Sequence, residues 1–342
     1  METGTTIAVD LAKSVFEIAV SERPGKVSER HRLSRKQFLS FFQRPPATVV
    51  MEACGSAHHW GRQIRELGHR VVLLPPHQTR PYVVRNKTDR TDTKGLLEAY
   101  RNEDIHPVPV KSLDQQVITA LHRVRSAWLA ERTAKINTVR GLLREIGITI
   151  PAGAQHVAPV ARNSAADADC PIPDALRATF FELGTEIEEL EERMAGVERQ
   201  LQVLAKESEL IRRLQTIPGI GLLTATALAA FIGDAGRFPS GRHFASYIGI
   251  TPRENSSGLR RRLGSISKRG DGYLRMLLIH GARSVLHHTS PGDSDRLRAW
   301  ALELQTRVGH NKAAVALANR MARIAWALWK HQCDYEVRSR NA

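Results

Sequence analysis

The sequence predicts an α/β domain in the N-terminal part of the chain, followed by a mainly α-helical remainder. Short apolar runs typical of β-strands alternate with amphipathic helical stretches over the first hundred residues. Further along, apolar residues recur at the spacing of a helix and then as a heptad repeat. The chain has 342 residues, of which 42% are hydrophobic, which is enough for two or three domains with buried cores.

The first part of the chain contains, in order, three strands, a helix, a strand, a second helix and a fifth strand. The strands are expected at TTIAVDLA, VFEIAVSE, KVSERHRL (at the edge of the sheet), ATVVMEA and HRVVLLPP. Ser34 is expected to cap the helix RKQFLSFFQ, and Gly68 to end the helix HHWGRQIRELG. Because this is the element order of the RNase H-like fold, we expect that fold over residues 1–110.

The rest of the chain is predicted to be mainly helical. In residues 111–206, an apolar stripe at helical spacing covers Leu121–Ile146, and an apolar heptad flanked by glutamates covers Leu183–Leu204. The heptad predicts a coiled coil, which pairs either with the preceding helix or with another subunit. Residues 148–175, rich in Pro and Ala without a period, are expected to be a loop. Residues 207–342 are predicted to form a helical last domain that holds much of the positive charge.

The composition indicates a partner of opposite charge. The formal net charge of +15 favours nucleic acid or an anionic membrane surface. No run reaches the ~20 apolar residues of a membrane span, and the N-terminal residues lack the pattern of a signal peptide, so we expect no membrane association. The three cysteines lie far apart without zinc spacing, which favours a reducing cytoplasm over a disulfide framework.

Four carboxylates lie at the ends of predicted strands and helices, which is an unusual placement in a chain with a net charge of +15. Asp10 and Glu52 end the first and fourth strands, where adjacent parallel strands would place both at one edge of the sheet. Asp89 and Asp92 lie three residues apart at the start of a helix and therefore face the same way. Converging carboxylates suit two hard divalent cations that clamp a phosphodiester. A turn or helix-cap role explains any one of them equally well, but the four together favour a metal site.

Two motifs of the last domain suggest contacts with phosphates. The turn Pro218–Gly221 lies between two helical stretches, where free backbone N–H groups bind a DNA phosphate or where glycines simply allow close helix packing. Ser256, Ser257 and Gly258 stand beside three consecutive arginines. Nearby cations or a metal would stabilise a serine alkoxide and the charge that develops on phosphorus. Taken alone, the serines are also explained as a turn and the arginines as a solvated phosphate-binding face.

The sequence resembles a known family along most of its length. The segments IAVDLAKSVFEIAV, VVMEACGSAHHWGRQIRELGHRVVLLPP and NKTDRTDTKGLLEAY resemble the N-terminal DEDD domain of the insertion-sequence-110 family of bacterial transposases, a domain similar to the resolvase RuvC. PGIGLLTATALAAFIGD, FASYIGITPRENSSG and ISKRGDGYLRMLLIHGA resemble its C-terminal transposase domain. This chain departs from the family at Cys54 and at Ala57, His58 and His59, none of which is an expected metal ligand.

The resemblance implies a role for each candidate residue. Asp10, Glu52, Asp89 and Asp92 would bind magnesium, as two Mg²⁺ ions. Ser257, with Ser256 as the alternative, would attack DNA to form a phosphoserine link, in one composite site with the carboxylates. The residues expected to bind nucleic acid are Gly219, Gly221, Arg253, Arg260, Arg261, Lys268 and Arg269.

The function implied is that of a site-specific DNA recombinase that moves an insertion sequence at the bacterial nucleoid. The family further implies a structured non-coding guide RNA that pairs with donor and target DNA, a partner for which the composition gives no separate indication. The heptad favours a homodimer, and two DNA partners would require a tetramer. Two rivals remain: a two-metal RuvC-like nuclease that uses water as nucleophile, and a non-catalytic nucleic-acid-binding protein.

Overall fold

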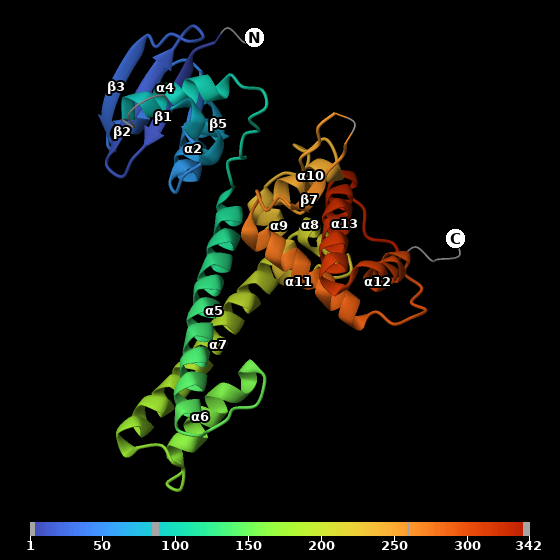
Figure 1. The fold of residues 1–342 in the computed structure, drawn as a ribbon. Coiled ribbons are helices and arrows are strands. Elements are labelled where there is room, and N and C mark those ends of the chain that lie inside the picture. The colour runs from blue at the N-terminus through green and yellow to red at the C-terminus, as the bar shows by residue number, and fades with distance from the viewer. Residues whose placement is uncertain (1–3, 84–88, 259, 338–342) are drawn as a thin grey trace. The chain divides into compact units, whose positions relative to one another are not determined.

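The computed structural model describes residues 4–83, 89–258 and 260–337 (Figure 1). It consists of two compact units, Met1–Gln116 and Val117–Ala342, which we describe separately. The further division of the second unit at residue 206 stays a prediction. In the part of the chain that the structure describes, no helix combines the length and the apolar character needed to cross a membrane.

The first unit is built on a five-stranded sheet with the order β3-β2-β1-β4-β5. Strands β1 to β3 pair antiparallel, whereas β1, β4 and β5 pair parallel. The expected strands are therefore confirmed, including the edge position of β3, and the sheet fits an RNase H-like domain. The strand bounds are Thr6–Leu11 (β1), Val15–Ser21 (β2), Glu29–Ser34 (β3), Thr48–Glu52 (β4) and Arg70–Leu74 (β5).

Helices cover both faces of this sheet. One face packs against α1 (Phe38–Phe41) and α2 (Ala57–Glu66), where the rings of Phe16 and Phe38 lie 4.3 Å apart. The other face packs against α4 (Asp89–Tyr100). Because side chains alternate along a strand, successive residues of β1 and β4 enter these two cores in turn. Two short turns, α3 (Pro76–Thr79) and η1 (Arg80–Tyr82), follow β5.

The predicted capping role of Ser34 is wrong. Helix α1 begins only at Phe38, and its N-cap is Gln37. Ser34 is instead the last residue of β3, where it pairs with Val15 of β2. Its backbone N–H and its hydroxyl both donate to Gln37 Oε1, at 3.1 and 2.7 Å. Strand pairing thus continues through Ser34, and the residue stabilises the turn before the helix.

The second unit begins with a long helical hairpin. Helix α5 (Leu113–Glu145), which starts at the end of the first unit, is followed by η2 (Ala154–His156), α6 (Val157–Ala166) and α7 (Asp174–Glu207). Helix α6 corrects the expectation of a loop over residues 148–175. Its alanines are buried at helical spacing against α5 and α7, because small side chains allow helices to approach closely.

The heptad of α7 is buried within the single chain. Five of its seven positions lie in hydrophobic cores: Ile187, Leu190, Met194, Val197 and Leu201. Ion pairs join α7 to α5, from Arg125 to Glu198 at 2.7 Å and from Lys135 to Glu186 at 2.6 Å. The two helices therefore run antiparallel, and the preceding helix lies along the seam. The coiled coil itself stays a prediction.

The rest of the second unit is a helical bundle with one β-hairpin, which the sequence did not lead us to expect. Its core surrounds α9 and α13. The bounds are Glu209–Gln215 (α8), Leu222–Ile232 (α9), Gly241–Ile248 (α10), Pro252–Glu254 (β6), Leu263–Ile266 (β7), Gly272–His288 (α11), Arg296–Val308 (α12) and His310–His331 (α13).

A buried histidine connects three of these helices. His122 of α5 lies 2.9 Å from the Thr226 hydroxyl of α9 through Nε2, and 2.9 Å from the Tyr273 hydroxyl of α11 through Nδ1. The Thr226 hydroxyl donates to Leu222 O, so it accepts from Nε2–H, and Nδ1 accepts from Tyr273. Burial, helped by nearby Arg125, lowers the pKa of His122 from 6.5 to about 4 because the charged imidazolium is poorly solvated there.

This buried histidine predicts a loss of stability in mild acid. Unfolded chains take up a proton near pH 6.5, whereas the folded protein does so only near pH 4. The contribution of His122 is therefore complete above pH 6.5 and falls by up to about 3 kcal/mol as the pH drops to 4. Urea unfolding between pH 7 and pH 4 should show a smaller acid loss for His122→Gln. The exposed control His287→Gln should keep the wild-type loss, and equal losses in both variants would contradict the prediction.

Candidate active site and nucleic-acid interface

Asp10 and Glu52 lie at the carboxyl ends of neighbouring parallel strands. Val9 of β1 pairs with Met51 of β4, so the two carboxylates follow in the same register. By strand alternation they share the face of Ala8, which is the face covered by α4. Both residues are half-buried. Their backbones are thus about 5 Å apart, the spacing of adjacent strands.

Helix α4 supplies the other two predicted ligands. It begins at Asp89 and packs against β1 and β4 through Leu96 and its neighbours. Asp92 is half-buried on this helix, whereas the side chain of Asp89 lies outside the described residues. The fold therefore brings Asp10, Glu52 and the start of α4 to one face of the sheet.

These carboxylates have the chemistry of a divalent metal site. All are oxygen donors, which Mg²⁺ and similar hard cations prefer. Among the described side chains, no three or more His, Cys, Asp or Glu are gathered closely enough to hold an ion. Like-charged carboxylates repel one another, so a cation is what would draw them together.

The register reveals a fifth carboxylate that the sequence analysis missed. Glu17 of β2 pairs with Asp10, and Arg32 of the edge strand pairs with Glu17. Arg32, Glu17, Asp10 and Glu52 therefore form one row across the same face. Glu17 is half-buried. The short loop between β1 and β2 is the signal that could have predicted this pairing, because it sets the register of the hairpin.

An arginine on the edge strand fixes the start of α4. The guanidinium of Arg30 donates to Arg90 O at 3.2 Å and to the Thr93 hydroxyl at 3.3 Å. Thr93 is buried, and its hydroxyl donates to Arg90 O. These bonds hold the helical turn that carries Asp92. Arg30 is thus a second residue that sequence reasoning did not identify.

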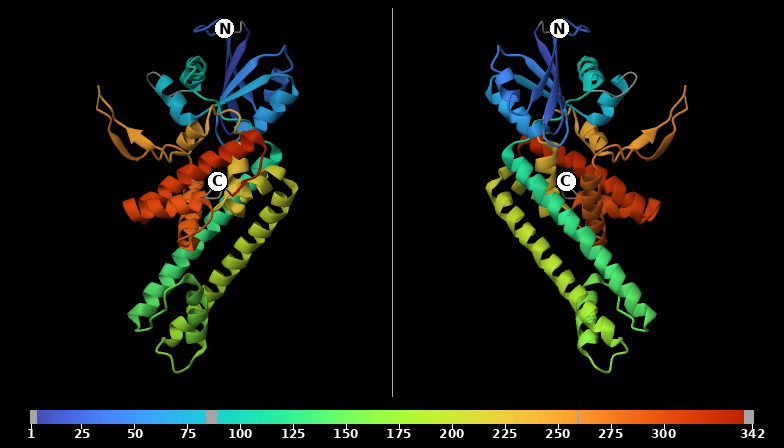
Figure 2. Two further views of the ribbon diagram at one scale, coloured as in Figure 1. Left: turned by 90° about the vertical axis from the view of Figure 1, so that its right-hand side faces the viewer. Right: turned by 90° about the vertical axis from the view of Figure 1, so that its left-hand side faces the viewer.

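The predicted nucleophile lies at the tip of the β6–β7 hairpin. Ser257 and Arg260 exchange backbone hydrogen bonds of 3.2 and 3.1 Å, which closes a tight turn. Below them, the Asn255 N–H donates to Arg262 O at 2.9 Å. The hairpin extends away from the helices of its unit (Figure 2). A substrate can therefore reach its tip without displacing the core.

The two serines of the tip differ in their contacts. The Ser256 hydroxyl donates to Glu254 Oε1 at 2.7 Å and accepts from the Arg262 N–H at 3.2 Å. The Ser257 side chain is exposed and makes no hydrogen bond to any other residue that the structure describes. Ser257 is thus the more accessible hydroxyl, whereas Ser256 is the one beside a base.

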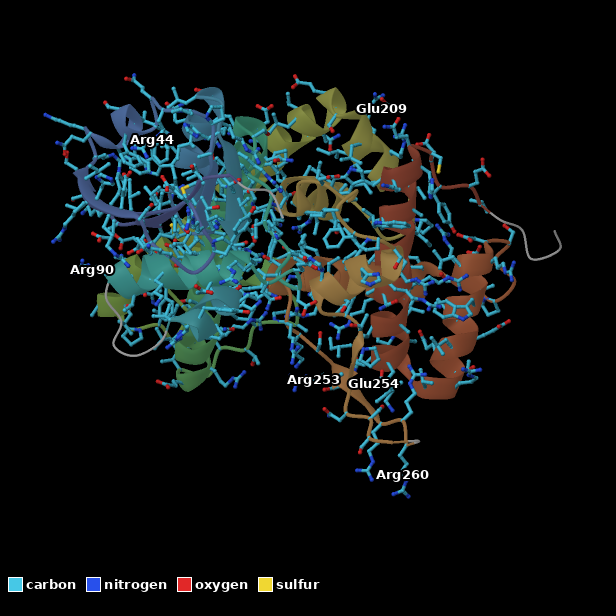
Figure 3. The ribbon with its side chains drawn as sticks, turned by 90° about the horizontal axis from the view of Figure 1, so that it is seen from above. Arg44, Arg90, Glu209, Arg253, Glu254 and Arg260 are labelled. Carbon is cyan, nitrogen blue, oxygen red and sulfur yellow. The ribbon has the colours of Figure 1, made fainter. Side chains whose placement is uncertain are left out.

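The arginines and the lysine that the sequence predicts to bind nucleic acid are exposed around this hairpin. Arg260 lies at the tip, beyond Arg253 and Glu254 (Figure 3). Arg261 pairs with Glu254 at 3.4 Å, yet its side chain remains 73% exposed. Arg253, Lys268 and Arg269 are also exposed, nearer the base of the hairpin. The structure thus places all five predicted cations on one projecting element and the segment that follows it.

The base of the hairpin is held tightly by backbone contacts. The Lys268 N–H donates to Gly249 O at 3.0 Å, and the Arg275 guanidinium donates to Ile248 O at 3.0 Å. A Cβ on Gly270 would lie 1.9 Å from Tyr247 O, so only glycine fits there. This close approach fixes the direction in which the hairpin leaves the bundle.

Gly219 lies in a packing turn between α8 and α9. Its φ is +83°, and a Cβ there would lie 2.8 Å from Gly281 O of α11. In turn, a Cβ on Gly281 would lie 1.9 Å from Gly219 O. These contacts match the alternative explanation of the motif, which is close packing between helices.

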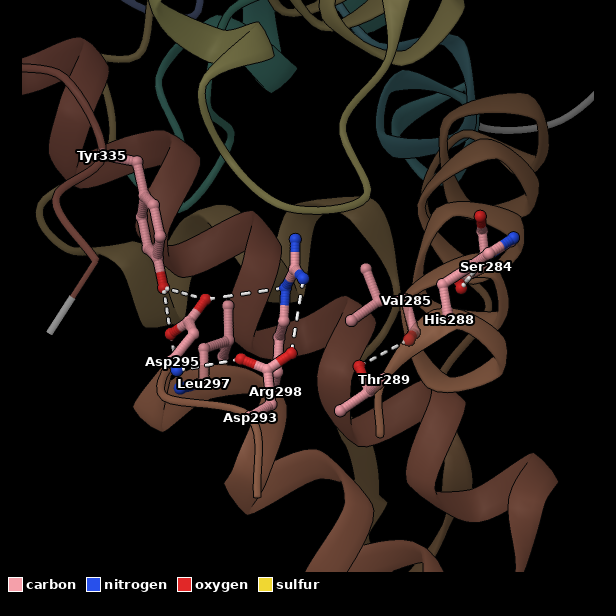
Figure 4. Close-up of polar contacts among 9 residues, drawn as sticks. All are labelled: Ser284, Val285, His288, Thr289, Asp293, Asp295, Leu297, Arg298 and Tyr335. Carbon is pink, nitrogen blue, oxygen red and sulfur yellow. Dashed lines mark hydrogen bonds and ion pairs between the residues drawn. The ribbon is translucent and has the colours of Figure 1, made fainter. Parts of the chain in front are cut away.

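Gly221 faces open space, but its surroundings are acidic. The residue caps α9, and nothing lies within 4 Å of where a Cβ would stand. It lines a cavity of about 900 Å³ together with Asp293 and Asp295. Asp295 accepts from the Tyr335 hydroxyl at 3.0 Å, while Arg298 approaches both carboxylates (Figure 4). A phosphate at Gly221 would have to overcome this negative charge.

Comparison with known proteins defines the class. Residues 7–148 match the transposase family of IS110-type DEDD proteins, and residues 211–298 match the family described as "Transposase IS116/IS110/IS902 family". The first match covers the sheet and its carboxylates, and the second contains the serine hairpin. The fold and site thus belong to a DNA transposase, an enzyme that acts on insertion-sequence DNA.

Similar proteins cover nearly the whole chain. A "Probable family 20 transposase" of Pseudomonas aeruginosa is 44% identical over 96% of this chain and 98% of its own length. The transposases of IS1111A from Coxiella burnetii and IS1328 from Yersinia enterocolitica are each 38% identical over 96% of this chain, and over 90% and 97% of their own lengths. The chain belongs to the IS110 family of insertion-sequence transposases.

The tight base of the hairpin predicts that Gly270→Ala destabilises the protein. The new Cβ would meet a backbone oxygen, which cannot move aside as a flexible side chain can. We expect a loss of at least about 2 kcal/mol in the free energy of unfolding. The matched control is Gly264→Ala in β7, where the nearest atom would lie at 3.9 Å. Urea unfolding of both variants checks this, and equal stabilities would show that the base is not constrained.

Proposed function

We propose that this transposase cleaves and rejoins DNA through a covalent phosphoserine intermediate formed by Ser257. The observation that carries the proposal is the hairpin tip, where an exposed serine stands among arginines on an anchored base. A nucleophile for a bulky polyanion needs this combination of reach and positive surroundings.

The reaction would exchange one phosphoester for another. Ser257 Oγ attacks phosphorus, an Oγ–P bond forms, and the bond from phosphorus to the 3′ oxygen breaks. The serine proton passes to water, and the departing 3′ oxygen takes up a proton. Arg260 and Arg261 stabilise the charge that develops on the phosphoryl oxygens. Because the link preserves the energy of a phosphodiester, a 3′-hydroxyl can attack it in reverse and rejoin the strand.

The DEDD family indicates use of a divalent metal, and we propose two Mg²⁺ ions held by Asp10, Glu52, Asp89 and Asp92. When bound, such ions supply Lewis-acid stabilisation to attacking and leaving oxygens. The shared face of Asp10 and Glu52 supports this assignment. The four carboxylates and Ser257 would act on the same phosphate.

Ser256 is a second candidate for the nucleophile. Its hydroxyl donates to Glu254 at 2.7 Å, the geometry that general-base activation requires. In that case Glu254 would take the serine proton, and Ser257 would only shape the turn. The remaining rival is attack by water, as in a RuvC-like nuclease.

We also propose that a structured guide RNA directs the enzyme to donor and target DNA in the cytoplasm. The net charge of +15 and the exposed hairpin cations support a nucleic-acid partner. These charges do not separate RNA from DNA, since both present phosphates. The guide therefore needs its own test, which is the dependence of the reaction on RNA from the same element.

A dimer, and a tetramer on two DNA partners, completes the proposal. The heptad of α7 is already buried in one chain, so the contact between subunits needs another surface. Helix α5 offers one, because Val117 and Val124 are 43% and 41% exposed on it. These residues lie seven apart and so share one face of the helix.

The covalent step predicts a protein–DNA adduct that depends on one serine. DNA labelled on the strand that keeps its 5′-phosphate, incubated with Mg²⁺ and RNA from the element, should yield a denaturation-stable adduct. Ser257→Ala and Asp10→Asn should each lower its yield at least about 1,000-fold. Ser256→Ala is the matched control and should retain the adduct.

Other outcomes would identify the rivals. An adduct lost in Ser256→Ala and in Glu254→Gln, but kept in Ser257→Ala, would assign the nucleophile to Ser256. Cleavage that survives both serine variants and fails only in Asp10→Asn would establish attack by water. Equal yields with and without RNA would remove the guide from the proposal.

The assembly proposal predicts a dimer that α5 mediates. Light scattering should give the mass of two chains without nucleic acid, and of four with donor and target DNA. The double variant Val117→Glu/Val124→Glu should dissociate the dimer, because buried like charges oppose association. The control is Val203→Glu on α7, which is 57% exposed. A monomer under every condition would contradict both the dimer and the tetramer.

A further inference from the structure

A large groove lies beside the base of the serine hairpin. It has a volume of about 1630 Å³ and lies between β7, the start of α10, α12 and one face of α13. Along α13 the lining residues recur three and four positions apart, from Lys312 to Ala327. Ile250, Val315 and Ile324 make part of the surface apolar. The groove is thus a second feature of the transposase domain, distinct from the hairpin tip.

Every charged residue that lines this groove is a cation. They are Arg242, Lys312, Arg320 and Arg323, and the lining contains neither Asp nor Glu. The cavity at Gly221, in contrast, contains two aspartates. A positive potential over an apolar surface favours an anionic partner that also has an apolar part.

An aromatic ring and an arginine are stacked within the groove. The guanidinium carbon of Arg320 lies 4.5 Å from the centre of the Trp300 ring. Burial lowers the pKa of Arg320, which means that its cation is partly deprived of water and gains from a nearby anion. Flat groups of this kind are the surfaces on which nucleic-acid bases stack.

We propose that this groove binds unpaired nucleotides of a DNA or RNA strand. Bases would lie against the apolar surface and the Trp300–Arg320 stack, and phosphates would contact Arg323 and Lys312. The proposal deepens the proposed function, since it assigns a strand-binding site next to the hairpin that carries the nucleophile. Its test measures binding alone, so the result decides the groove proposal independently of the phosphoserine proposal.

The apolar surface is the reason to favour unpaired nucleotides over a duplex. In a duplex the base faces are stacked and hidden, so only phosphates would meet the groove. An unpaired strand offers both its phosphates to the cations and its base faces to the apolar surface. RNA and unwound DNA share this chemistry, and the experiment separates them.

The test compares three labelled 20-mers of one sequence: single-stranded DNA, single-stranded RNA and duplex DNA. Fluorescence anisotropy with the full chain gives each affinity over a range of salt concentrations. Lys312→Ala/Arg323→Ala should weaken single-strand binding about 10- to 100-fold and reduce the salt slope by about 1.4. Trp300→Ala should weaken it about 10-fold without changing the slope, and should leave the duplex unaffected.

Matched variants control for charge and folding. Arg307→Ala/Lys330→Ala removes two exposed cations from α12 and α13 that lie outside the groove, and it should retain most of the affinity. Trp300→Phe keeps an aromatic face and should restore binding if Trp300→Ala lowers it by losing the stack. The probe that binds more tightly, RNA or DNA, identifies the source of the strand.

Three results would overturn the proposal. One is that the groove double variant binds single strands as well as its control does. Another is that Trp300→Ala weakens duplex and single strand equally. The third is that the groove variants change the oligomeric mass but not the affinity, which would make the groove a contact for a second copy of the chain. Ser257→Ala should bind the single strands with wild-type affinity. Loss of the covalent adduct in that variant would therefore be distinguishable from loss of strand binding in the groove.

Discussion

The parallel pairing of β1 with β4 is the constraint on which the carboxylate site depends. The register that sets Val9 beside Met51 sets Asp10 beside Glu52, on the face covered by α4. A slip of one residue would turn a carboxylate into the opposite core around Phe16. An unpaired charge buried there would cost several kcal/mol. The packing that folds the sheet therefore also determines where its acidic residues lie.

The serine hairpin combines a fixed base with an exposed tip. Its base is fixed by backbone bonds around Gly249 and by the close approach at Gly270. Its tip is a short turn closed between Ser257 and Arg260. Ordering a long arginine side chain costs up to about 2 kcal/mol in rotamer entropy. If the tip binds a phosphate as we propose, that cost falls at binding, where charge-assisted hydrogen bonds would offset it.

Local patterns predicted the strands, the long helices and the place of Asp10 and Glu52 in the sheet. The predictions failed where contacts with residues distant in the sequence determine the local structure. Ser34 has the chemistry of a helix cap, yet strand pairing retains it in β3. The alanine-rich sequence of α6 has the composition of a linker, but its alanines form a helix because they pack against the two long helices α5 and α7. Glu17 shows no motif at all, and only the register places it beside Asp10.

Glu254 illustrates how the hairpin's own acid can prepare a site for phosphate. Its carboxylate accepts from the Ser256 hydroxyl and pairs with Arg261. Such an exposed ion pair contributes at most about 1 kcal/mol, so a phosphate that forms short charge-assisted bonds can displace it. Displacement would free Arg261 for the phosphate and leave the carboxylate beside the Ser256 hydroxyl as a base. Glu254 would then order the hairpin and become available as a base when substrate binds. Glu254→Gln therefore separates attack by Ser256 from attack by Ser257 more sharply than removal of Arg260 or Arg261 does.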